Sequence, residues 1–142
     1  MKFKSSTGFS LVELLVVVAI IGILSSIGII TYTGYIEGAR KNSAENIVQQ
    51  IALAQSEEYA NSGSYFVSGG TPPVTSCSPN NSTSREIETS LFGGDDIIPD
   101  DIDFEICVEG SGSTFEIVAL STKYDNCTIS LARNGAVLRD NC

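Results

Sequence analysis

Residues 9–37 read FSLVELLVVVAIIGILSSIGIITYTGYIE, and Glu13 is the only charged residue between the two ends of this stretch. Leu14 to Ile36 gives 23 consecutive uncharged residues. About 20 residues suffice to cross the hydrocarbon core of a bilayer, because a helix rises ~1.5 Å per residue. The apolar core of a secretory signal is shorter, about 7–15 residues. The stretch therefore predicts a membrane-spanning helix.

Glu13 is the candidate functional residue of this helix. An acidic side chain in the middle of a span costs about 2.5–3.5 kcal/mol on insertion scales. An acidic residue within a span is therefore a candidate functional residue, and its carboxylate needs a partner. Because Glu13 lies only four residues after Phe9, a carboxylate that reaches the membrane interface by itself is the alternative reading.

Helical periodicity continues beyond the apolar stretch. Seven residues recur at intervals of three and four and predict one buried face, while charged residues occupy the other faces. Asn61-Ser62-Gly63 supplies the glycine that ends many helices. We therefore predict a single helix from Phe9 to about Ala60. The residues of its predicted buried face are Ala44, Ile47, Val48, Ile51, Ala52, Gln55 and Tyr59.

Composition excludes several classes of function. The chain has 142 residues, eight Lys+Arg against 17 Asp+Glu, and a net charge of −9. Direct nucleic-acid binding is not expected, because neutralising phosphates needs a cationic face. The sequence has no histidine, which excludes histidine-based triads and histidine metal ligands. We expect no enzymatic activity and no cofactor.

The remainder of the chain predicts an α+β fold. Residues 63–101 are rich in Ser, Thr, Pro, Gly and Asn and predict a connecting region with one short helix, Ser84–Phe92. Alternating apolar and polar residues then predict four antiparallel strands that pack on the second half of the long helix. The predicted strands are 102–109, 114–122, 127–133 and 136–141, with a turn at Gly110–Ser113.

Asn134-Gly135 lies between the last two predicted strands and favours a two-residue type I′ turn, which fixes the strand register. Directly opposed strand residues lie close enough for a disulfide. Cys127 then bonds to Cys142, and Cys77 is left with Cys107. The opposed pairs would be Arg133 with Ala136, Leu131 with Leu138, Ile129 with Asp140, and Cys127 with Cys142.

Four cysteines allow three connectivities, so the other pairings stay open at this point. A shift of one residue in the register would break the geometric argument. All four cysteines follow the apolar stretch, and an even number of cysteines in a small domain is typical of an oxidising compartment. We therefore expect residues 38–142 to lie outside the cytoplasm.

An acidic loop, GGDDIIPDDID, covers residues 93–103. Carboxylate oxygens are the ligands that calcium prefers, although the spacing here does not follow the regular repeat of a helix–loop–helix calcium site. Acidic loops are more often simply solvated. We expect no metal centre, and the only calcium candidates are Asp95, Asp96, Asp100 and Asp101.

The block from Gly8 to Gly22, GFSLVELLVVVAIIG, closely resembles the amino terminus of type IV pilins and the related pseudopilins. It combines a short basic leader that ends at Gly8, Phe9 after the cleavage point, Glu13 four residues later, and an uninterrupted apolar helix. The resemblance implies that a prepilin peptidase cuts after Gly8 and methylates the new amine of Phe9. It also implies that Glu13 neutralises the terminal amine of a neighbouring subunit. Pilins usually carry a proline where this chain has Ile30, so we expect a straighter membrane helix.

The resemblance also implies partners and location. Subunits would wait in the inner membrane with a cytoplasmic amino terminus, then assemble with copies of themselves and other pilins into an extracellular fibre for adhesion, motility or DNA uptake. The inner-membrane assembly machinery would be a further partner. The alternatives are a pseudopilin of a type II secretion system and a single-pass membrane-anchored binding domain. The implied segments are the leader 1–8, the span 9–36, the amphipathic helix 37–62, the connecting loop 63–101 and the sheet 102–142.

Overall fold

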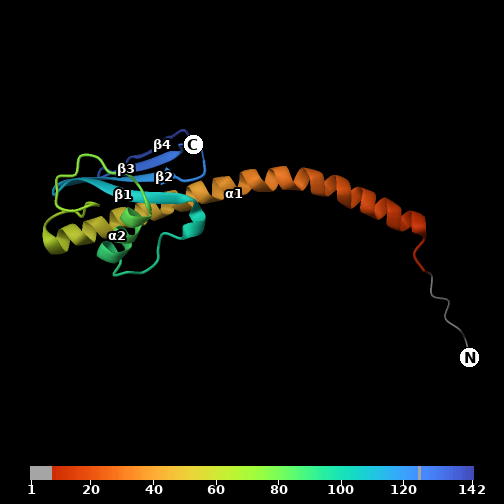
Figure 1. The fold of residues 1–142 in the computed structure, drawn as a ribbon, viewed down its shortest axis with the longest axis horizontal. Helices are drawn as coiled ribbons and strands as arrows, with labels where there is room; N and C mark the ends of the chain where they lie inside the picture. Colours follow the sequence, from red (N-terminus) through yellow and green to blue (C-terminus); the bar gives the residue numbers. More distant parts are fainter. Residues whose placement is uncertain (1–7, 125) are drawn as a thin grey trace, which may run out of the picture. The chain divides into compact units, whose positions relative to one another are not determined.

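The computed structural model describes residues 8–124 and 126–142. Lys2 and Lys4 of the expected leader lie outside the described residues. A long helix comes first and a four-stranded sheet last (Figure 1). The chain divides into two compact units, Met1–Gly38 and Ala39–Cys142, and we call the second unit the head. The elements are α1 (Leu11–Ser62), α2 (Asn81–Leu91), a 3₁₀ turn (Asp100–Ile102), β1 (Phe104–Ser111), β2 (Thr114–Ser121), β3 (Thr128–Ala132) and β4 (Val137–Asp140).

The first half of α1 has the properties of a membrane span. By length and composition α1 is long and apolar enough to cross a membrane, and none of its apolar 18-residue window is buried within the chain. Two hydroxyls in this part bond back to the helix: Ser26 Oγ donates to the Ile23 carbonyl at 2.7 Å, and Thr31 Oγ1 donates to the Ile27 carbonyl at 3.2 Å. Polar groups satisfied within one helix are what a lipid environment requires.

α1 runs without interruption through residue 30, so the helix has no break where pilins usually carry proline. It ends close to the predicted position, before Gly63, whose φ of 78° is left-handed and whose N–H donates to the Tyr59 carbonyl at 2.9 Å. Glycine adopts this conformation without a steric cost, which explains why the helix stops here.

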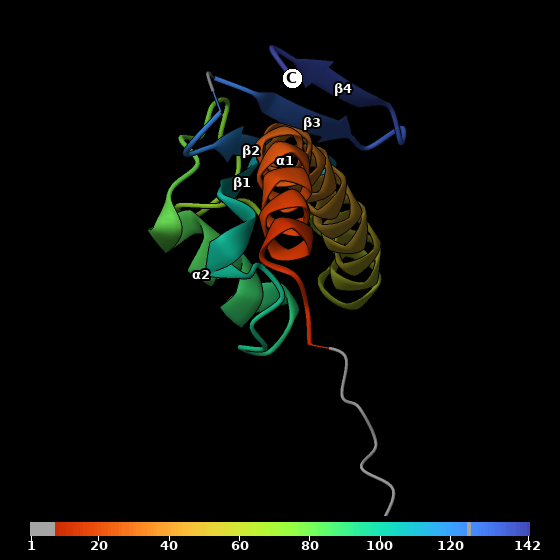
Figure 2. The same cartoon turned by 90° about the vertical axis from the view of Figure 1, so that its right-hand side faces the viewer.

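The sheet has the strand order β1-β2-β3-β4 with every neighbouring pair antiparallel, so the predicted meander is confirmed. Figure 2 shows the second half of α1 against one face of the sheet. Ile106, Ile117 and Ile129 from three strands are completely buried in one cluster with Val48 and Ile51 of α1. Each such side chain contributes about 1.5–3 kcal/mol by leaving water. The predicted α+β fold is confirmed. Five of the seven residues of the predicted helix face are buried, but Ala52 is only half-buried and Tyr59 is 42% exposed, because the face leaves the sheet near the end of α1.

Gln55 is the one amide side chain on that predicted face, and it is completely buried. Its amide nitrogen donates to the Phe66 carbonyl at 2.9 Å, and its amide oxygen accepts from the Phe66 N–H at 2.9 Å. The side chain thus satisfies both the N–H and the carbonyl of one backbone residue. This pairing fixes the segment that follows α1.

The outer edge of β1 is covered rather than open. Ser84 Oγ of α2 accepts from the Ile106 N–H, and Ser68 Oγ accepts from the Val108 N–H. Gly110 exchanges two backbone bonds with Val74, at 2.7 and 2.8 Å. An open edge strand is a template for unwanted pairing, so these contacts protect β1.

Gly110 is a position where only glycine fits. Its φ is 144°, and a Cβ there would lie 2.3 Å from the Thr114 carbonyl oxygen and 2.8 Å from the Phe115 Cα. We expect Gly110→Ala to lower the free energy of unfolding by about 1–3 kcal/mol, the range for a residue held in a disfavoured conformation. The measurement is thermal unfolding of the full chain in detergent, followed by the near-ultraviolet circular dichroism of the head tyrosines.

Gly112→Ala is the matched control for this substitution. Gly112 has no left-handed φ, and a Cβ there would meet only the Ser64 Cβ at 3.6 Å, an ordinary contact. The control should unfold within about 0.5 kcal/mol of the wild type, as most surface substitutions do. Equal losses of stability at the two glycines would show that the close approach of Gly110 to the backbone of Thr114 and Phe115 does not cause the destabilisation.

The predicted start of the sheet and its first turn need correction. Residues 100–102 form a 3₁₀ turn, and Asp103 has a left-handed φ of 58°, so β1 begins at Phe104 rather than at residue 102. Ser111 is paired directly with Thr114, which confines the turn to Gly112 and Ser113. α2 also begins earlier than predicted, because the Asn80 side chain caps it by accepting from the Ser82 and Thr83 N–H groups.

The β3–β4 register differs from the prediction by one residue. Leu131 pairs with Val137 rather than Leu138, and Thr128 rather than Ile129 pairs with Asp140. The Gly135 N–H donates to the Ala132 carbonyl at 2.8 Å, and of the two predicted turn residues only Gly135 has positive φ. The loop is therefore longer than the predicted two-residue turn and contains a left-handed glycine, a common alternative to the type I′ turn.

Candidate functional site at the amino terminus of the helix

Gly8, Phe9 and Ser10 precede the first turn of α1, and all three are exposed. The Phe9 side chain is 88% exposed. The bond between Gly8 and Phe9 therefore lies in accessible, non-helical chain immediately before the helix. A peptidase needs such a segment, because the regular backbone of a helix does not fit an extended binding cleft.

Ser10 and Glu13 form a reciprocal cap at the start of α1. The Ser10 N–H donates to Glu13 Oε2 at 3.0 Å, and the Glu13 N–H donates to Ser10 Oγ at 3.4 Å. The Leu14 N–H donates to the Ser10 carbonyl at 3.2 Å and closes the first turn. This is the capping box, in which two otherwise unsatisfied donors at a helix start are satisfied by side chains.

The capping box was not among the predictions made from the sequence. Its signal, Ser-x-x-Glu directly before an apolar run, is present at residues 10–13. The carboxylate of Glu13 thus has a hydrogen-bond partner within its own chain, a backbone N–H. The helix dipole also favours an anionic group in this first turn.

The head contains two disulfides, Cys77–Cys107 and Cys127–Cys142, with Cα–Cα distances of 6.2 and 4.6 Å. The second forms although Cys127 and Cys142 are not opposed in the observed register. β4 ends at Asp140, and Asn141 has a left-handed φ of 53°, which turns the chain before Cys142. Closing a 15-residue loop contributes about 3 kcal/mol in the chain-entropy model.

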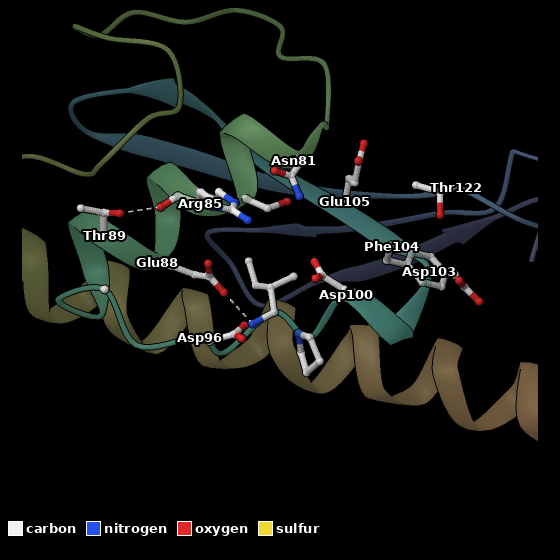
Figure 3. A pocket seen from close by; sticks show the side chains of 14 residues that line it. Asn81, Arg85, Glu88, Thr89, Asp96, Asp100, Asp103, Phe104, Glu105 and Thr122 are labelled. Carbon is white, nitrogen blue, oxygen red and sulfur yellow. Dashed lines mark hydrogen bonds between the residues drawn. The ribbon is translucent and has the colours of Figure 1, made fainter.

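The four calcium candidates lie in the loop after α2 and in the 3₁₀ turn, where all are exposed. Asp96 and Asp100, but not the other two, line a hollow of about 400 Å³ beside α2 (Figure 3). Within the described residues, no group of three or more potential ligands is placed to hold a metal ion.

A long helix with an apolar first half, a capped acidic residue near its start and a small disulfide-bonded sheet define a pilin-like protein. Residues 3–29 match the family described as the prokaryotic N-terminal methylation motif. Similarity extends to the fimbrial protein EcpC of Eikenella corrodens, with 39% identity over 56 residues. That alignment covers 39% of this chain and 37% of the relative, well under two thirds of the relative's length. No solved structure matches the chain significantly. The motif and the relative support the predicted type IV pilin.

Proposed function

We propose that this chain is a pilin subunit of a type IV pilus, made as a precursor and assembled into an extracellular fibre. The observation that carries the proposal is the exposed Gly8–Phe9 bond directly before a capped apolar helix, within the methylation motif. The fimbrial relative supports the same role. A pilin is a structural protein, which points to a structural rather than a catalytic role.

In the proposed maturation, a prepilin peptidase cuts after Gly8 and methylates the amine of Phe9. The new cationic chain end lies four residues from Glu13, which is held by the Ser10 N–H at 3.0 Å. A carboxylate in this place can exchange the backbone donor for the amine of a neighbouring copy. A charge pair in a water-poor environment offsets the desolvation that each ion would suffer alone, and removing one partner is strongly unfavourable.

We propose residues 9–36 as the membrane span before assembly and as the part buried within the fibre afterwards. The amino terminus would be cytoplasmic and the head, with its disulfides, external. Residues 37–62 continue the helix from the span into the head, and residues 63–101 and 102–142 supply the fibre surface. The proposed partners are copies of this chain, other pilins, the peptidase and the inner-membrane assembly machinery.

Mass spectrometry of the chain from its native membrane tests the proposed maturation. We expect a mature chain that begins at Phe9 and carries one methyl group on its amine. The control is the chain produced in cells without a prepilin peptidase, which should keep residues 1–8. A native chain that retains residues 1–8 would contradict the proposal and would favour a simple membrane-anchored domain.

A further inference from the structure

The hollow beside α2 is lined by more carboxylates than cationic side chains. We call it the α2 hollow; it lies between α2, the loop that follows α2 and the start of β1 (Figure 3). Its charged lining residues are Arg85 and five carboxylates, Glu88, Asp96, Asp100, Asp103 and Glu105.

Two of these carboxylates are used in holding the head together. Glu88 Oε1 accepts from the Ile97 and Ile98 N–H groups at 3.1 and 2.9 Å. Asp103 forms an ion pair with Arg40 and lies 3.6 Å from the Lys123 ammonium. These bonds are satisfied within the chain, so neither residue needs an external partner.

Asp96 and Asp100, unlike Glu88 and Asp103, have no partner among the described residues. Both side chains are exposed at the rim of the hollow, and neither has a hydrogen bond or ion pair in the described part of the chain. Figure 3 shows both near the hollow, Asp96 on the loop that follows α2 and Asp100 at the start of the 3₁₀ turn. Arg85 is the one cationic side chain in the lining, against five carboxylates. A concave surface with such an excess of one sign of charge attracts a group of the opposite sign.

The β3–β4 turn presents such a group. Residues 133–136 are all exposed, and we call them the hairpin tip. The Ala132 N–H donates to the Ala136 carbonyl at 3.1 Å, and the Ala136 N–H donates to Asn134 Oδ1 at 2.9 Å. These bonds hold the tip in one conformation, so little conformational entropy is lost when it binds.

Arg133 supplies the positive charge of the hairpin tip. Its guanidinium lies 5.7 Å from the centre of the Tyr65 ring and, among the described residues, has no carboxylate within ion-pair distance. Arg40 and Arg139, by contrast, are paired with Asp103 and Glu45. Arginine beside aromatic side chains is typical of the residues that dominate protein interfaces.

The two surfaces belong to opposite edges of the sheet. α2 packs on β1, which is one edge strand, while the hairpin tip leads into β4, which is the other. Figures 1 and 2 both show α2 and β4 on different sides of the head. Two complementary patches that face apart cannot meet within one chain, but each can meet the other patch on a neighbouring copy, and such contacts build open arrays.

We propose that Arg133 of one copy enters the α2 hollow of the next copy and pairs with Asp96 and Asp100. The contact rests on the proposed function, since it forms between heads in the assembled fibre. A guanidinium presents a planar set of donors that matches carboxylate oxygens, which gives the contact direction as well as strength. It fixes the angular position of each head relative to its neighbour.

Charge reversal in the full chain tests this contact. Arg133→Glu and Asp100→Lys, made separately, should each lower the amount of sheared fibre at least about fivefold, because like charges then face each other across the interface. The double variant Arg133→Glu with Asp100→Lys should restore fibre toward the wild-type amount. Protease resistance of each full-length chain in detergent checks that the head remains folded.

Glu57→Lys is the matched control, since it reverses a charge at an exposed position outside both surfaces. Fibre that survives Arg133→Glu unchanged, or a double variant no better than the single ones, would overturn the contact. Fibre that dissolves with a calcium chelator yet tolerates Arg133→Glu would mean that the hollow holds a cation instead, which also overturns it. Absence of fibre from the processed wild-type chain would overturn the proposed function itself, and this contact with it.

Discussion

Glu13→Gln is expected to abolish fibre formation while leaving the chain processed, membrane-inserted and folded. Glutamine keeps an amide oxygen where Glu13 accepts from the Ser10 N–H at 3.0 Å, and Gln serves as well as Glu in a capping box. It cannot neutralise the amine of a neighbouring copy. An unpaired buried charge costs about 3–5 kcal/mol, which is at least about a hundredfold in the association constant of each subunit.

The measurement compares the fibre sheared from cells with the amount of processed subunit in the membrane. Ser10→Ala is the complementary variant, because it removes the hydroxyl that accepts from the Glu13 N–H but leaves the carboxylate charge. It should cost about 0.5–2 kcal/mol of helix stability and reduce fibre much less. Glu37→Gln, the same change at the other end of the span, should leave fibre unchanged. If the Glu13→Gln chain assembles as well as the wild type, pairing with the amine is not the role of this carboxylate.

The helices and the sheet were predictable because each has a local signal. Three-four spacing placed Val48 and Ile51 on the buried face of α1, and Gly63 marked its end. Period-two alternation in β1 and β2 placed Ile106 and Ile117 in the core. These patterns depend only on the geometry of one element, so a single sequence is sufficient to identify them.

The β3–β4 register was not predictable, because its cause lies in a distant part of the chain. In the observed register Arg139 pairs with Ile129 and lies on the side of β4 toward α1, where its Nε donates to Glu45 Oε2 at 3.0 Å. The predicted register would have placed Asp140 opposite Ile129, near Glu45 and with the same charge. Leu138 lies on the opposite face of β4 in the observed register and is 66% exposed.

The candidate site was predictable in part. The resemblance to pilins selected Gly8, Phe9 and Glu13 as neighbours at the start of a helix, but not the bond between Ser10 and Glu13. The Ser-x-x-Glu pattern at residues 10–13 is a local signal of that bond. The partner of Gln55 had no such signal, because Phe66 belongs to a loop whose path depends on the whole head.

Gln55→Leu is expected to destabilise the head strongly. Leucine fits an apolar site but leaves both the N–H and the carbonyl of Phe66 without their partners. Each buried unsatisfied backbone group costs about 1–3 kcal/mol, so the expected loss is about 2–6 kcal/mol. A loss of this size is comparable with the whole stability of a small domain. Near-ultraviolet circular dichroism follows it best, because Tyr59 and Tyr65 stack with their ring centres 4.5 Å apart beside the affected segment.

Gln50→Leu is the matched control, since Gln50 is exposed about one and a half turns earlier on α1 and the same atoms change there. It should alter the free energy of unfolding by less than about 0.5 kcal/mol. Equal stability of the Gln55→Leu and Gln50→Leu chains would show that the amide bonds contribute nothing net, and that apolar packing alone holds the segment after α1 in place.

Gln55→Glu separates the two bonds of the buried amide. A carboxylate still accepts from the Phe66 N–H but, while ionised, cannot donate to the Phe66 carbonyl. The stability of this variant should therefore approach that of the wild type as acid protonates the introduced carboxylate, because only the protonated form reproduces both bonds. The measurement is thermal unfolding of the variant and the wild type across the acid range. A gap between the two chains that stays constant with pH would show that the lost donor is not the cause of the destabilisation.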